Sequence, residues 1–276
     1  MNWLQSLLYA LVSGLAEFLP ISSHAHKAML LYLFGCAEEP PLLGLFIHIG
    51  IAIALFFGAK TYLVRLQREY RLMRLPKHRR SRQPLRQSVF DITLLKFAVI
   101  PLVLAFIWYN KTLFWRGSLH YVAIFLALNG LILHIPLYLP RGNKDAQNIT
   151  RIDALLFGIF GALSAFPGIS RIGSISSIAG ARGADTQQTF KWALLLSFPV
   201  LAGYICYDIY AIFASGFAGI YFTLFLQSIF CGAVAFLGAR AAIAGIRFLT
   251  VRTGLYGFSY YSWGAALFTF ILYMTI

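Results

Sequence analysis

Reactive side chains are crowded into one short apolar stretch of the sequence, GLAEFLPISSHAH at residues 14–26. Beside a helix-breaking proline it holds a carboxylate, two hydroxyls and two imidazoles: Glu17, Ser22, Ser23, His24 and His26. Carboxylates and imidazoles transfer protons or hold metal ions, and an activated serine hydroxyl attacks electrophilic centres. One buried polar residue is often structural, but a cluster at a helix break favours a reactive site.

A second cluster lies in FPGISRIGSISS, residues 166–177, where Arg171 follows a Pro-Gly pair. The planar guanidinium of arginine matches phosphate oxygens bidentately. Three serines, Ser170, Ser174 and Ser176, add hydroxyl donors, and a following helix N-terminus favours an anion. Arg171 could instead extend toward the membrane interface, but its place inside a Pro-Gly-Ser break favours anion binding.

Together the two clusters are typical of phosphoryl transfer. A serine attacks phosphorus, a histidine handles the proton, an arginine stabilises the charge, and a carboxylate holds a divalent cation or acts as a base. A substrate that reaches such a site inside a membrane would be a lipid phosphate.

The composition indicates a polytopic membrane protein. Its 276 residues are 59% hydrophobic and only 12% charged, with a mean hydropathy of +0.74, whereas soluble domains are about 25% charged. Six apolar runs approach the length of about 20 residues that a span needs: 42–62, 94–110, 120–139, 188–213, 220–246 and 255–276. We therefore predict an all-α integral membrane protein with about six full transmembrane helices.

Two further apolar segments, 2–34 and 152–180, are interrupted by Pro, Gly and Ser. Broken helices at membrane depth must be buried in protein or line a wet cavity, so we predict two re-entrant helical hairpins. GLAEFLP (14–20) and GALSAFP (161–167) share their Gly and Pro spacing. This similarity predicts inverted-topology repeats over 1–140 and 151–276, each a re-entrant segment with three spans, in a single membrane domain.

The net charge of +14 is concentrated in a predicted loop at 64–90, which carries nine basic residues between 65 and 86. The positive-inside rule puts this loop in the cytoplasm. A nucleic-acid partner is not expected, because no aromatic platform accompanies the basic residues.

The two clusters resemble the signature segments of the undecaprenyl-diphosphate phosphatase family of the bacitracin-resistance type. The family's first motif reads roughly E-G-x-T-E-F-L-P-x-S-S-T-G-H and its second P-G-x-S-R-S-x-x-T. LFIHIGIAIAL (45–55), FKWALLLSFPVLAG (190–203) and YGFSYYSWG (256–264) are similar to further family segments. The resemblance implies inverted repeats with two re-entrant hairpins in the bacterial inner (plasma) membrane, as a multi-pass protein surrounded by membrane lipids and able to pair as a homodimer. It also implies hydrolysis of undecaprenyl diphosphate, dependent on a divalent cation (Mg²⁺ or Ca²⁺), which recycles the carrier lipid for cell-wall synthesis.

Carried over by position, the resemblance makes Ser23 the nucleophile and His26 its proton partner. Glu17 would hold the metal or act as the base, with His24 as a second candidate ligand. Arg171 would act in catalysis and, with Ser22, Ser170, Ser174 and Ser176, bind the diphosphate.

The chain departs from the family pattern where Ser13 replaces the first glutamate and where Ile172 and Ile175 replace hydroxyl residues. It is therefore interpreted as a divergent member. A second hypothesis is a non-hydrolytic transporter or flippase of polyprenyl phosphate on the same scaffold. A purely structural membrane protein is a third interpretation, and the concentration of polar residues at two helix breaks disfavours it.

Overall fold

The computed structural model describes residues 1–76, 89–107, 115, 117–139, 142, 144, 148–217, 219, 221–252 and 256–275. Apart from an isolated bridge between Lys144 and Ala184, the regular secondary structure of these residues is helical, as the sequence predicts. The elements are α1 (Trp3–Phe18), α2 (Ser23–Leu33), α3 (Pro41–Met73), α5 (Val89–Ile107), α7 (Leu119–His134), η1 (Ile135–Tyr138), α8 (Arg151–Ala162), η2 (Leu163–Ala165), α9 (Arg171–Ala181), α10 (Thr186–Leu195), α11 (Ser197–Ala214), α12 (Phe222–Arg252) and α13 (Gly257–Met274).

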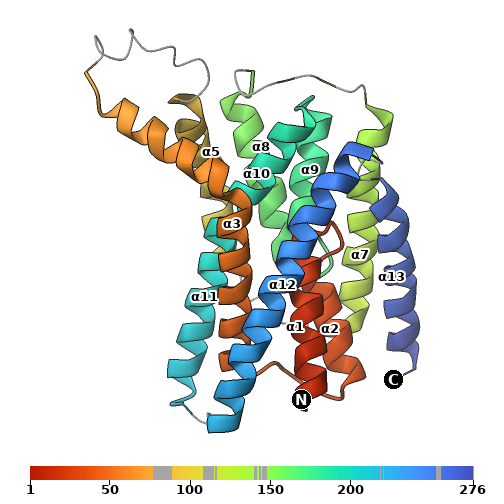
Figure 1. The fold of residues 1–276 in the computed structure, drawn as a ribbon. Helices are drawn as coiled ribbons and strands as arrows, with labels where there is room; N and C mark the ends of the chain where they lie inside the picture. Colours follow the sequence, from red (N-terminus) through yellow and green to blue (C-terminus); the bar gives the residue numbers. More distant parts are fainter. Residues whose placement is uncertain are drawn as a thin grey trace.

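Both segments predicted to be broken are interrupted at their prolines. Because a residue before proline avoids the helical conformation, α1 ends at Phe18 with Leu19 extended, and Phe166 is extended ahead of Pro167. In Figure 1 the pair α1 and α2 enters from the end that carries the N-terminus, whereas α8 and α9 enter from the opposite end. The turns of the two pairs therefore face each other in the middle of the molecule.

The described residues of the six segments predicted to span the membrane are largely helical. Four helical stretches among the described residues have the length and apolar composition for a membrane crossing: Pro41–Met73, Leu119–Tyr138, Thr186–Ala214 and Phe222–Ile246. The predicted span 188–213 is interrupted at Leu196, between α10 and α11. Pro199 explains the break, because it has no N–H for the Leu195 carbonyl and its ring crowds that group.

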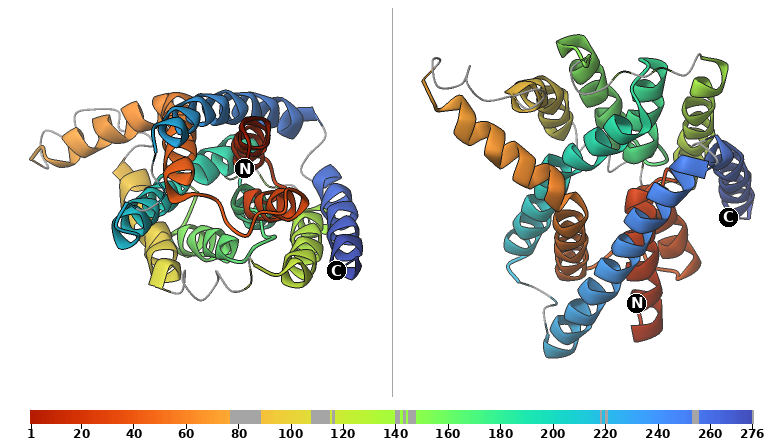
Figure 2. Two further views of the ribbon diagram at one scale, coloured as in Figure 1. Left: turned by 90° about the horizontal axis from the view of Figure 1, so that it is seen from below. Right: turned by 45° about the horizontal axis from the view of Figure 1, so that its top comes forward.

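The predicted loop at 64–90 begins instead as helix, because α3 continues without a break to Met73. With 33 residues, α3 is about 50 Å long, which exceeds the bilayer core of about 30 Å. Its last turns project away from the helical body, as the right-hand view of Figure 2 shows most clearly. Residues 77–88, with the remaining basic side chains of this prediction, lie outside the described residues.

Glycines allow α12 to pack closely against both α1 and α3. A Cβ at Gly14 of α1 would lie 2.2 Å from the Ala235 carbonyl oxygen, and one at Gly50 of α3 would lie 2.1 Å from that of Gly232. Small residues at such crossings let helix backbones approach within a membrane. On the other side of the molecule α13 lies beside α7 (Figures 1 and 2).

Replacing Gly50 with alanine should destabilise the protein, because the new methyl group collides with backbone rather than with a movable side chain. Overpacking of this kind costs about 1–3 kcal/mol, so the midpoint of heat-induced unfolding in detergent should fall by several degrees. Gly245→Ala is the matched control on α12, since a Cβ there would meet nothing within 4 Å. Equal midpoints for the two variants would contradict this close packing.

Candidate functional site

The turns of the two broken segments are hydrogen-bonded to each other. The Ser170 hydroxyl donates to the Leu19 carbonyl oxygen over 3.1 Å, and the Gly168 N–H donates to the Ser22 hydroxyl over 3.2 Å. Ser22 has a positive φ of 67°, a conformation that costs a non-glycine residue about 1–3 kcal/mol. Each turn thus supplies partners for polar groups that its own helices leave unpaired.

Asn129 of α7 joins the same two turns from the side. Its amide nitrogen donates to the Pro20 carbonyl oxygen over 3.1 Å, and its amide oxygen accepts from the Ser170 N–H over 2.8 Å. The side chain is fully buried and also donates to Ser262. The sequence interpretation missed Asn129, although an amide inside the apolar run 120–139 is a signal for such a role.

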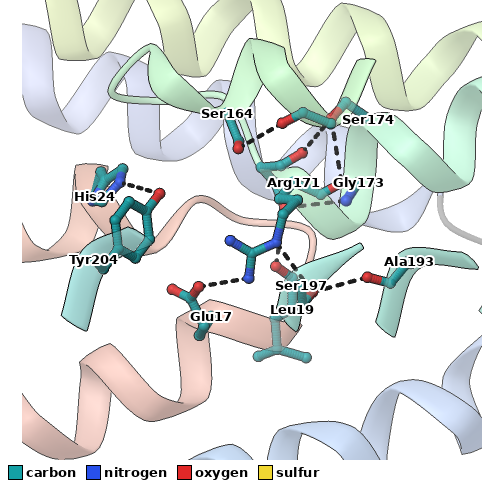
Figure 3. Close-up of polar contacts among 12 residues, drawn as sticks. Glu17, Leu19, His24, Ser164, Arg171, Gly173, Ser174, Ala193, Ser197 and Tyr204 are labelled. Carbon is teal, nitrogen blue, oxygen red and sulfur yellow. Dashed lines mark hydrogen bonds and ion pairs between the residues drawn. The ribbon is translucent and has the colours of Figure 1, made fainter. Parts of the chain in front are cut away.

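A buried ion pair crosses between the two segments. The Arg171 guanidinium contacts the Glu17 carboxylate at 2.7 Å, and its Nε donates to the Ser197 hydroxyl over 3.1 Å (Figure 3). The Arg171 side chain is only 4% exposed and the Glu17 side chain only 7% exposed. The Ser23 hydroxyl also interacts with the Glu17 carboxylate. Since desolvation offsets most of what a buried pair gains, this ion pair is better explained by a role in binding or chemistry than by stability.

One small polar pocket opens around this ion pair. Its lining combines both segments with α11 and consists of Ala16, Glu17, Ser22, Ser23, His24, Ser164, Ile169, Ser170, Arg171 and Tyr204. The structure therefore brings together six of the residues singled out from the sequence: Glu17, Ser22, Ser23, His24, Ser170 and Arg171. In Figure 3, His24 and Tyr204 lie to one side of the Glu17–Arg171 pair.

His26 lies outside this pocket, unlike its predicted place beside Ser23. Its Nδ1 contacts the Ser22 carbonyl oxygen at 2.8 Å, and its Nε2 contacts the Tyr261 hydroxyl at 2.6 Å. Its ring also stacks on that of Tyr261 at 5.8 Å. Ser23 and His26 are three positions apart on α2, and the imidazole of His26 contacts Tyr261 of α13.

Ser174 and Ser176 are likewise not part of the pocket lining. The Ser174 hydroxyl donates to the carbonyl oxygens of Phe160 and Ser170, and Ser176 is buried. Because α9 begins at Arg171, Ser174 and Ser176 lie about one to one and a half turns beyond the helix N-terminus. Their part in a phosphate site stays a prediction, which the lining of this pocket does not support.

The residues at which the chain departs from the family pattern are also absent from the pocket lining. Ile172 and Ile175 are buried in the hydrophobic core. Ser13 is buried too, and its hydroxyl donates to the Tyr9 carbonyl oxygen over 2.6 Å. Glu17 is thus the one carboxylate among the described pocket residues.

Sequence reasoning missed three further residues around the pocket: Ser164, Ser197 and Tyr204. Tyr204 lies one helical turn before Asp208 on α11, and Asp208 contacts His48 Nδ1 of α3 at 2.6 Å. His48 is an ionisable residue inside the apolar run 42–62, but its position in the sequence does not indicate its partner. The i, i+4 spacing of Tyr204 and Asp208 within an apolar helix was the available signal.

Four apolar helical stretches of spanning length, with a polar pocket where two broken segments meet, define a multi-pass membrane protein with a polar site in its interior. More specifically, the chain belongs to the family described as bacitracin resistance protein BacA, whose model matches residues 6–268.

Curated relatives match over nearly the whole chain. The chain is 28% identical over 270 residues to an undecaprenyl-diphosphatase of Alkaliphilus metalliredigens, which covers 95% of this chain and 96% of the relative. It is 30% identical over 280 residues to undecaprenyl-diphosphatase 4 of Bacillus thuringiensis subsp. konkukian, covering 100% of this chain and 99% of the relative. An undecaprenyl-diphosphatase of Carboxydothermus hydrogenoformans is 29% identical over 268 residues, or 95% and 94% of the two chains.

Proposed function

We propose that this protein hydrolyses undecaprenyl diphosphate to undecaprenyl phosphate and inorganic phosphate, and so recycles the carrier lipid for cell-wall synthesis. The observation that carries this proposal is the convergence of Ser23, Glu17 and Arg171 in one buried pocket. Family membership and the names of the relatives support hydrolysis over the transporter hypothesis.

The pocket residues suit a two-step displacement. Ser23 Oγ attacks the terminal phosphorus, the bond from that phosphorus to the bridging oxygen breaks, and undecaprenyl phosphate leaves. Water then attacks the phosphoserine, which releases inorganic phosphate and restores the serine hydroxyl. Arg171 stabilises the negative charge on the transferred phosphoryl group. Glu17 orients Arg171, and the Ser23 hydroxyl interacts with the Glu17 carboxylate.

The other predicted residues take supporting parts in this proposal. Ser22 and Ser170 hold the two turns together at the pocket and present polar groups to the diphosphate. We assign His26 a positioning role, because its ring anchors the Ser22 carbonyl rather than facing the pocket.

The membrane arrangement is proposed as six spans with α1–α2 and α8–α9 as re-entrant hairpins of two inverted repeats, 1–140 and 151–276. Entry of the two helix pairs from opposite ends supports it, and Arg65, Arg68 and Arg71 at the far end of α3 support a cytoplasmic position for that end. Location in the bacterial plasma membrane fits the family. Homodimer formation stays a prediction.

The test is phosphate release by the purified protein from undecaprenyl diphosphate in detergent with Mg²⁺ or Ca²⁺. We expect turnover by the wild type, loss of turnover in Ser23→Ala, and full turnover in the control Ser215→Ala at the end of α11. No phosphate release with either cation would refute hydrolysis. If lipid phosphate then crossed the bilayer of proteoliposomes, the transporter hypothesis would replace it.

A divalent cation is proposed to enter with the substrate rather than to reside in the protein. Among the described residues no group of three His, Cys, Asp or Glu side chains is placed to hold a metal. Glu17, the pocket's carboxylate, already pairs with Arg171. Mg²⁺ commonly uses one or two carboxylates and takes further ligands from substrate phosphates. Glu17 would serve as one ligand of an ion that the diphosphate brings with it, and His24 lines the same pocket. Such an ion would supply neutralisation of the phosphate charge.

Chelation should therefore abolish turnover without unfolding the protein. With EDTA we expect no phosphate release and recovery on adding Mg²⁺ or Ca²⁺. The cation alone should leave the thermal midpoint unchanged, because ligands stabilise only when they bind the folded state. The cation with a non-hydrolysable prenyl diphosphate should raise it. A rise with the cation alone would indicate a resident metal site instead.

A further inference from the structure

A second imidazole of the first cluster, His24, faces the pocket that His26 does not reach. Its Nε2 contacts the Tyr204 hydroxyl at 3.0 Å, and the two rings meet edge-on with centroids 5.3 Å apart. His24 and Tyr204 both line the pocket together with Ser23 and Arg171, and Figure 3 shows the His24–Tyr204 contact beside Arg171. A hydroxyl can donate to a neutral ring nitrogen or accept from a protonated one, so this contact can persist when the ring changes its protonation state.

Tyr204 packs against a buried pair, His48 and Asp208, neither of which lines the pocket. Its ring packs against that of His48 with centroids 5.3 Å apart. His48 Nδ1 contacts Asp208 Oδ2 at 2.6 Å, and the two side chains are only 9% and 11% exposed. A carboxylate on one ring nitrogen fixes the tautomer and orientation of a histidine. Asp208, His48, Tyr204 and His24 thus form a continuous row from α11 and α3 to the pocket.

We propose that His24 is the proton-transferring catalytic residue of this pocket, and that Tyr204, His48 and Asp208 are positioning residues that act through it. The inference rests on the proposed phosphatase function and assigns its proton chemistry. His26 is unsuited to that part, because both of its ring nitrogens contact other groups outside the pocket.

The proton balance closes within the two displacement steps. As Ser23 Oγ bonds to phosphorus, its proton passes to the His24 ring. That proton then passes to the bridging oxygen as the phosphorus–oxygen bond breaks, and His24 becomes neutral again. In the second step His24 takes a proton from water, whose oxygen bonds to phosphorus, and returns it to Ser23 Oγ as phosphate leaves. General acid–base transfer of this kind contributes about 10²–10⁴-fold in rate.

The first test is His24→Ala. We expect kcat for phosphate release to fall about 100-fold or more, with KM changed little, and to recover partly when imidazole is added. Imidazole rescue separates a proton-transfer role from a structural one, because free imidazole cannot repair misfolding. Normal kcat in His24→Ala, or a loss that imidazole does not rescue, overturns the inference. A wild type that releases no phosphate refutes the phosphatase itself.

The positioning row is tested with Tyr204→Phe and Asp208→Asn. Tyr204→Phe removes one hydrogen bond and should lower kcat about tenfold, whereas Tyr210→Phe, an exposed tyrosine on the same helix, should not. Residues that act through His24 should have no further effect once it is gone. The double variant His24→Ala/Asp208→Asn should therefore be no slower than His24→Ala. A further tenfold loss of kcat in the double variant would overturn the coupling. If Asp208→Asn does not fold, the same comparison is made with His24→Ala/Tyr204→Phe.

Discussion

Replacing Arg171 with lysine should lower kcat for undecaprenyl diphosphate hydrolysis by about 100-fold or more. The guanidinium reaches Glu17 and Ser197 simultaneously, and an ammonium group cannot reproduce that planar fork. Lysine would keep the positive charge, but it would not orient its N–H donors toward the transferred phosphoryl group as the guanidinium does. Loss of one oriented donor to a transition state commonly costs about 10²–10³-fold in kcat.

Kinetics of the purified variants would measure this effect, with Arg182→Lys as the matched control. Arg182 follows the same helix, α9, and its Nε contacts Asp153 at 2.6 Å, outside the pocket. We expect Arg182→Lys to retain near-normal kcat. An Arg171→Lys variant with wild-type kcat would show that the Glu17–Arg171 pair serves the fold rather than the reaction.

The second large effect is expected from Asn129→Leu. Leucine fills similar space, but it leaves the Ser170 N–H and the Pro20 carbonyl without their side-chain partner. Each unsatisfied buried group costs about 1–3 kcal/mol, so the free energy of unfolding should fall by about 2–6 kcal/mol. Because both groups belong to turns that form the pocket, turnover should fall as well.

The thermal midpoint in detergent and the rate of phosphate release would both be measured. Asn129→Asp serves as the graded comparison, since a carboxylate can still accept from the Ser170 N–H but cannot donate to Pro20. We expect Asn129→Asp to lie between the wild type and Asn129→Leu in thermal midpoint. An Asn129→Leu variant as stable and as active as the wild type would show that the Asn129 hydrogen bonds to the two turns do not stabilise the protein.

Local chemistry explains which features could be predicted from sequence. The breaks at Pro20 and Pro167 follow from the proline ring itself, and the helices follow from long apolar runs. The meeting of Glu17 with Arg171 could be expected from the similarity of the two broken segments. The breaks and the helices depend on neighbours in the chain, whereas the meeting of Glu17 with Arg171 depends on the repetition of one pattern in two distant segments.

The remaining features depend on tertiary geometry that spacing does not reveal. Ser174 and His26 are near the right turns, but their directions depend on where α9 and α2 begin and on what packs against them. Asn129 and Asp208 are single polar residues whose partners lie 41 and 160 positions away in sequence. A lone polar residue in an apolar run indicates that a partner exists, but it does not say which one.

The reciprocal bonding of the two turns also has a consequence for biosynthesis. The Leu19 carbonyl accepts a hydrogen bond from Ser170, which lies 151 positions later in the chain. At about 5–20 residues per second, synthesis of the intervening chain takes roughly 8–30 s. Until Ser170 is made, the first broken segment lacks this partner for its Leu19 carbonyl, and unpaired backbone groups are costly in lipid. We expect it to stay near the water-exposed membrane surface, and to settle at depth only when the second half of the chain arrives.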